Sequence, residues 1–169
     1  MSTTTAAKTM IAGPLEPAVL ARIAEEGYGP GAWHGPDLKA ALADVGSELA
    51  FWRPAPGRHN IAEIAVHHAY CTRSAHAQLS GTDPEPFVLD GEDWFELSNP
   101  KRLSWAGIQT LVETEHRRFQ KAVAASTVDG AGKNGAAALN QQFEIVLGLT
   151  CHAIYHAGQV QLIKRLHAG

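Results

Sequence analysis

The amino-acid sequence predicts an all-α protein, a four-helix bundle with a short extra helix at its N-terminal end. Apolar residues recur at intervals of three and four through several segments, and no segment sustains the alternation that is typical of a β-strand. The chain has 169 residues, of which 45% are apolar, and this is enough for one core of substantial size. We therefore expect one domain over residues 13–169, after a flexible lead-in over residues 1–12 that shows no clear period.

Two helical segments are expected before the first long helix. The first runs over residues 14–26, and the Gly- and Pro-rich stretch 27–31 ends it. The second starts at Pro36, which suits the first position of a helix, and it ends before Pro54 because a helix rarely continues through a proline.

The longer helices follow. Asn60 and Glu63 have the spacing of a capping box, in which the Asn side chain accepts a backbone N–H and the Glu reaches back, so a helix is expected over residues 61–79. Residues 80–102 are rich in Gly, Pro, Asp and Ser, and they are too many for a tight turn. They predict a crossover connection or a loop that covers one end of the bundle. The remaining helices are expected over residues 105–123 and 138–166, with a Gly-rich break at 130–135.

Charge and cysteine content exclude several classes of protein. Fourteen Lys and Arg stand against seventeen Asp and Glu, and the basic residues are scattered, so neither nucleic acid nor an anionic membrane is an expected partner. Two cysteines are too few for a disulfide framework, and no N-terminal run has the character of a signal peptide. No segment approaches the roughly 18 apolar residues of a membrane span. We expect a cytoplasmic protein with reduced thiols.

Two histidines occupy the middle of an apolar stripe in the last predicted helix. The stripe follows the spacing of one helix face and consists of Ile145, Leu149, His152, His156, Val160 and Ile163. Histidines four residues apart project side by side, so their imidazoles can converge on one metal ion. Two ligands do not complete a coordination shell, and a further ligand must come from a facing helix.

The helix over residues 61–79 offers His67 and His68 as that further ligand. One apolar stripe of this helix includes His68, and an overlapping stripe includes His67, so the spacing alone does not choose between them. A lone buried histidine is most often a hydrogen-bonded core residue, which is the competing interpretation for each of these side chains.

Two stretches of the sequence resemble the DinB-like family. Pro54-Ala55-Pro56-Gly57 followed by His59-Asn60-Ile61-Ala62-Glu63-Ile64-Ala65-Val66-His67 resembles the signature of the family's second helix, and the stretch from His152 to Val160 resembles that of its last helix. The resemblance extends from about Gly35 to Leu166. It implies the bundle fold of that family and one divalent metal ion, zinc or nickel, held by His67, His152 and His156. The family often has Trp where this chain has His59, so no role is carried over to that position.

Several further residues have two interpretations. Cys71 and Cys151 are near the predicted ligands and are either soft ligands or buried apolar residues, with burial favoured. Glu115 and His116 interrupt an apolar stripe, so they either lie beside the metal or lie at a solvated edge of the helix. Glu63 is expected to cap its helix. The remaining histidines are expected to be structural or exposed: His68, His76, His116 and His167. Four residues in irregular segments either line a pocket or plug the core: Trp33, His34, Trp94 and Phe95.

Three neutral imidazoles leave a divalent ion with an open coordination position, which is typical of catalytic sites. The sequence contains no HExxH, no G-x-S-x-G, no phosphate-binding glycine loop and no CxxC, and no catalytic side chain is assigned. The family resemblance implies thiol-dependent transferases and an isomerase among many members without an assigned reaction. The leading hypothesis is a thiol S-transferase-like enzyme whose metal activates a small thiol. The alternatives are metal-dependent hydrolysis by bound water and a non-catalytic metal-containing binding or stress protein. Expected partners are a small-molecule substrate, with a low-molecular-weight thiol and a second copy of the chain as further candidates.

Overall fold

The computed structural model describes residues 13, 15–126 and 135–169, and all regular structure within these residues is helical. The helices are α1 (Pro17–Gly27), α2 (Leu38–Ala43), α3 (Ser47–Phe51), α4 (Ile61–Ser80), α5 (Trp105–Ala125) and α6 (Gly135–Ala168). The predicted all-α class is therefore confirmed. The lead-in over residues 1–12 and most of the predicted break at 130–135 lie outside the described residues. Within the described part of the chain, no helix has the length and apolar character needed to cross a membrane.

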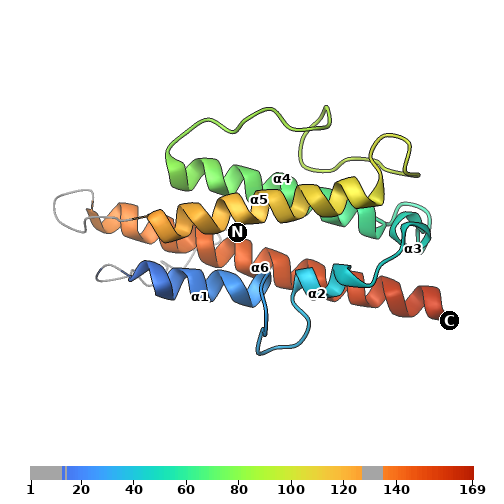
Figure 1. Ribbon diagram of the computed structural model, residues 1–169, viewed down its shortest axis with the longest axis horizontal. Helices are drawn as coiled ribbons and strands as arrows, with labels where there is room; N and C mark the ends of the chain where they lie inside the picture. Colours follow the sequence, from blue (N-terminus) through green and yellow to red (C-terminus); the bar gives the residue numbers. More distant parts are fainter. Residues whose placement is uncertain (1–12, 14, 127–134) are drawn as a thin grey trace, which may run out of the picture.

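The four longer helices lie side by side along the long axis of the molecule (Figure 1). Helices α1 and α6 run in one direction, and α4 and α5 run in the other, so consecutive helices α4 and α5 are parallel (Figure 1). A parallel pair requires a connection that returns along the full length of the bundle. Residues 81–104 make this return over α4, which confirms the crossover predicted from their composition (Figure 1).

Helix α4 begins and ends where its local sequence predicts. The Asn60 side chain accepts a hydrogen bond from the backbone N–H of Glu63 at 2.9 Å, and the backbone N–H of Asn60 donates to Glu63 Oε2 at 3.3 Å. The predicted capping box is thus present. At the other end Gly81 has φ 63°, the left-handed conformation that ends a helix and that glycine adopts at least cost.

The prediction of a single helix between Pro36 and Pro54 is wrong, because the chain forms the two short helices α2 and α3 there. Asp37 caps α2 by accepting the backbone N–H of Ala40 at 3.0 Å, so α2 begins at Leu38, two positions after the predicted start at Pro36. Between the two helices, the indole Nε1 of Trp105 donates to the carbonyl of Val45 at 2.6 Å. This bond to a distant residue uses a carbonyl that a continuous helix would need for its own hydrogen bond.

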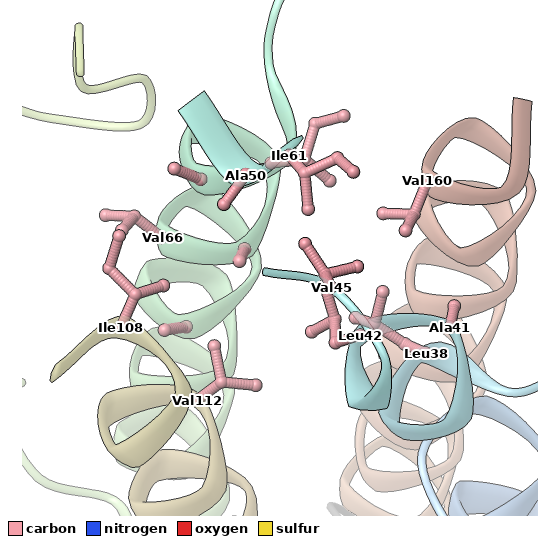
Figure 2. Packing of buried hydrophobic residues seen from close by; sticks show 14 of the residues in the cluster. Leu38, Ala41, Leu42, Val45, Ala50, Ile61, Val66, Ile108, Val112 and Val160 are labelled. Atoms are coloured by element: carbon pink, nitrogen blue, oxygen red, sulfur yellow. The ribbon is translucent and has the colours of Figure 1, made fainter. Parts of the chain in front are cut away.

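The core lies between the α4–α5 pair and α6. Side chains of α2 and of the residues after it fill the space between these helices, as Figure 2 shows for Leu42 and Val45 beside α4 and Leu38 facing α6. A second cluster joins α1 to α5 and α6 around Leu20 and Phe119. Helix α1, the short N-terminal helix expected from the sequence, therefore packs along α5 and α6.

Candidate metal centre

The imidazoles of His67 on α4 and of His152 and His156 on α6 meet at the interface of the two helices. His152 Nε2 lies 3.0 Å from His67 Nε2 and 3.0 Å from His156 Nε2. The pair on α6 converges because residues four apart lie on one face of a helix. His67 is 6% exposed and His156 is 2% exposed, so these two side chains are shielded from bulk water, whereas His152 is only partly buried.

The opposite nitrogen of each imidazole has a partner of its own. His67 Nδ1 lies 2.9 Å from the carbonyl oxygen of Asp93 and 3.1 Å from its carboxylate Oδ1. His156 Nδ1 lies 2.6 Å from Gln159 Oε1, one turn further along α6. His152 Nδ1 lies 3.4 Å from His68 Nδ1. The three rings are thus held from the outside while their Nε2 atoms face inward.

The crossover connection orients His67. Asp93 has φ 62°, a left-handed conformation that aspartate tolerates better than most residues. The next residue, Trp94, stacks on the His67 imidazole with centroids 3.9 Å apart and an interplanar angle of 6°. The other face of Trp94 stacks on His59 at 3.7 Å and 11°. Asp93 and Trp94 therefore fix both the hydrogen bond and the plane of this imidazole.

Burial keeps the imidazoles of His152, His156 and His68 neutral. Burial and the neighbouring imidazoles lower the pKa of His152 to about 4, and burial lowers that of His156 to about 4. The pKa of His68 falls well below its usual value for the same reason, because this side chain is only 1% exposed. Neutral imidazoles carry the free lone pairs that a metal ion requires.

Cys71 adds a sulfur donor at the edge of the group. Its Sγ lies 3.8 Å from His67 Nε2 and 3.9 Å from His67 Nδ1. Single donor atoms of His67, Cys71 and His152 all lie within 4.8 Å of one another, so these three residues form a cluster that can hold a metal ion. Burial and, to a smaller extent, the nearby Asp93 carboxylate raise the pKa of the Cys71 thiol to about 11.

A cavity of about 560 Å³ between α4 and α6 opens beside this cluster. Its wall includes Cys71 and His152 at one end, and Ser74 and Gly148 further along the groove. A Cβ atom placed on Gly148 would meet nothing within 4 Å, so the missing side chain leaves this part of the groove open. Of the three converging histidines, only His152 lines the cavity.

Several predicted residues lie elsewhere. Cys151 is exposed, so the favoured interpretation of it as a buried residue is wrong. Glu115 and His116 are 6% and 5% exposed, which overturns the interpretation as a solvated edge. The His116 ring packs on Tyr28 with centroids 4.0 Å apart. Glu115 lies 3.6 Å from Arg118.

The aromatic residues of the irregular segments separate into three groups. Trp33 is 92% exposed and His34 bonds the carbonyl of Glu26, so neither plugs the bundle. Phe95 is 4% exposed and belongs to the core. Trp94 covers the histidine group, as described above.

Glu63 has a larger role than the predicted cap. Its carboxylate also accepts bonds from Arg53 and from the backbone N–H of Leu97 at 3.0 Å, and it contacts His59 Nδ1 at 3.0 Å. Burial alone would raise the pKa of this carboxyl, but these bonds outweigh it and hold the pKa below its usual value. Glu63 thereby ties the crossover connection to the start of α4.

The sequence of the chain matches a family model described as the DinB superfamily over residues 32–160, more than half of its length. The chain belongs to the DinB superfamily. Comparison with curated proteins and with solved structures gives no match. The resemblance inferred from the two helix signatures is confirmed, and both α4 and the histidine pair of α6 lie inside the matched range of this DinB-superfamily chain.

Sequence reasoning missed the partners that orient the three imidazoles. Gln159 follows His156 by three positions, the spacing of neighbours on a helix, so it could have been found from the sequence. Asp93 and Trp94 carry no such signal, because they belong to an irregular segment with no period. His68 was expected to pack or to form a hydrogen bond, and the contact with His152 Nδ1 is such a bond.

Proposed function

We propose that His67, His152 and His156 bind one divalent metal ion through their Nε2 atoms, and that the chain is a metal-dependent enzyme of the thiol S-transferase type. The observation that carries the proposal is the position of His152 Nε2, which lies 3.0 Å from His67 Nε2 and 3.0 Å from His156 Nε2. Zinc and nickel accept imidazole nitrogen as a ligand.

The hydrogen-bond partners support this assignment. His67 Nδ1 faces two oxygen atoms of Asp93, which only accept, so in the neutral ring Nδ1 carries the hydrogen and Nε2 keeps its lone pair. His156 Nδ1 faces Gln159 Oε1, which has the same consequence. Two lone pairs therefore meet at His152 Nε2, and a single hydrogen on that atom can satisfy only one of them. A cation among the three nitrogens satisfies all of them.

Three nitrogen ligands leave an open coordination position, and the cavity lined by His152 gives a substrate access to it. When bound, the ion would act as a Lewis acid that lowers the pKa of a thiol or a water placed against it. The protein contributes the fixed ligand geometry, the shielding by Trp94 and a groove for the rest of the substrate.

The carboxylates near the ligands favour a thiol over water as the nucleophile. Hydrolysis benefits from a free carboxylate that takes a proton from water. Asp93 bonds His67, and the Glu63 carboxylate is occupied by Arg53 and two backbone N–H groups. A small thiol needs less assistance, because its usual pKa is only about 8.5.

Elemental analysis and thiol binding test the proposal. Protein purified without chelators should carry about one zinc or nickel ion per chain. His152→Ala and His156→Ala should lose it, whereas His76→Ala should keep it, since His76 bonds only Ser80 on its own helix. A cobalt-substituted form should gain a sulfur-to-metal charge-transfer band with a small thiol and should consume that thiol faster than metal-free protein when an electrophile is added.

Three results would contradict parts of this proposal. Metal-free protein that takes up neither zinc nor nickel would remove the metal site. Metal-dependent cleavage of esters or amides without any thiol-induced band would replace the transferase by a hydrolase. A loaded protein that is inactive in both assays would indicate a binding protein.

A further inference from the structure

His68 is buried between one of the proposed ligands and a threonine of its own helix. It is 1% exposed, and its ring lies nearly parallel to that of His152, with centroids 5.6 Å apart and an interplanar angle of 18°. Its Nδ1 faces His152 Nδ1 at 3.4 Å, and its Nε2 faces Thr72 Oγ1 at 3.3 Å. Both ring nitrogens of His68 are therefore engaged, and one of them acts on a metal ligand.

Thr72 sets the direction of this chain of hydrogen bonds. Its Oγ1 lies 2.8 Å from the carbonyl oxygen of His68, the bond back to the preceding turn that threonine commonly forms in helices. A carbonyl only accepts, so the threonine hydrogen is used there, and toward His68 Nε2 the same oxygen acts as an acceptor. His68 Nε2 thus carries the hydrogen of the neutral ring.

The position of this hydrogen determines which nitrogens of the neighbouring rings carry hydrogens. With the hydrogen on Nε2, His68 Nδ1 holds a lone pair and accepts from His152 Nδ1–H. His152 then keeps its own lone pair on Nε2, the atom that meets His67 and His156. The opposite tautomer of His152 would place a hydrogen at the centre of the three nitrogens and block a metal ion.

We propose that His68, held by Thr72, is a positioning residue that fixes His152 as the Nδ1–H tautomer and thereby raises the affinity of the site for its metal. This inference rests on the proposed metal centre, and it assigns to His68 a role through His152, not a role as a ligand. It completes a set in which each of the three imidazoles has its own orienting partner: Asp93, Gln159 and His68.

His116 provides a matched control for burial and ring chemistry. It is 5% exposed, and like His68 it packs against the ring of Tyr28. Among the described residues its ring nitrogens have no partner at hydrogen-bonding geometry, and none of the proposed ligands is bonded to it. His68→Phe and His116→Phe alter packing similarly, but only His68→Phe removes the hydrogen-bond partner of His152.

The first measurement is the tautomer itself. Long-range ¹H–¹⁵N spectra of the metal-free protein at pH 8, assigned by comparison with His152→Ala, should show His152 protonated at Nδ1 alone. A single Nε2–H form of His152 in the folded protein would overturn the proposal, whatever happens to the variants.

The second measurement is the dissociation constant for zinc alone, obtained by competition with a chromophoric chelator. His68→Phe should weaken zinc binding about 10- to 100-fold, the usual effect of losing the partner of a ligand, while saturating zinc still gives one ion per chain. His68→Gln, which restores an acceptor, should recover most of the affinity, and His116→Phe should bind as the parent does. Equal affinity of His68→Phe and the parent would refute the role of His68. Absence of zinc binding by the parent would refute the metal centre instead.

Discussion

Replacement of His116 by Phe should make the stability of the protein less dependent on pH. Burial lowers the pKa of His116 to about 4, from an ordinary value near 6.5. In the unfolded chain this imidazole takes up a proton as the pH falls through about 6.5, whereas in the folded protein it stays neutral until about pH 4. The folded state therefore loses stability as the pH falls from about 6.5 to about 4, and this contribution is fully present only above about pH 6.5.

The pKa of about 4 in the folded protein, against about 6.5 in the unfolded chain, fixes the size of the effect. At about 1.4 kcal/mol per unit, the free energy of unfolding should fall by about 2 to 3 kcal/mol between pH 7.5 and pH 4.5 through His116 alone. His116→Phe removes this contribution. At pH 7.5 the variant should be as stable as the parent or more stable by about 1 kcal/mol, because the replaced nitrogens have no hydrogen-bond partner within the part of the chain that the structure describes.

Urea unfolding of parent and variant at both pH values, with chelator present to keep the proteins metal-free, measures this difference. Other buried histidines contribute to both proteins alike, so the comparison isolates position 116. A pH dependence that is the same in parent and variant within about 0.5 kcal/mol would mean that His116 is not buried as a neutral group, and the reasoning would fail.

Two further predictions concern the open coordination position and the groove that leads to it. In the cobalt form without added thiol, no sulfur-to-metal band is expected. When thiol is added, Cys71→Ser should gain the same band as the parent. A band that the parent shows before thiol is added, and that Cys71→Ser lacks, would show that Cys71 occupies the open coordination position. Gly148→Leu should fold, since its Cβ meets no atom within 4 Å and leucine favours a helix over glycine by about 0.5–1 kcal/mol. It should bind one metal ion but lower metal-dependent turnover about tenfold or more by filling the groove, and unchanged turnover would place the substrate elsewhere.

Local signals predicted the parts of the fold that local interactions determine. The Asn60–Glu63 spacing located the start of α4 because the capping box is formed by the residues themselves. Between residues 36 and 53 the apolar spacing fitted one helix, yet two are present, and the bond from Trp105 to the carbonyl of Val45 joins residues 60 positions apart. Such a bond leaves no periodic trace in the sequence.

In the candidate site, too, local spacing predicted some residues, and others depend on long-range contacts. Spacing indicated His152 and His156, because four residues on a helix bring two side chains together. The choice between His67 and His68 depends on a small rotation of α4, and in the structure both contact His152, through its Nε2 and its Nδ1 respectively. Resemblance to the family selects His67 as the ligand, and that choice stays a prediction.

The crossover over residues 81–104 couples its own docking on α4 to metal binding, two equilibria that are separate in a bundle with short turns. Asp93 and His67 are 26 positions apart, and their hydrogen bond exists only while the connection is docked on α4. An ion that requires this orientation of His67 binds only the docked state. Free metal at about 100 times the dissociation constant would therefore oppose local opening of the connection by up to about 2.7 kcal/mol. Amide hydrogen exchange in a segment that supplies no ligand would then vary with the concentration of free metal.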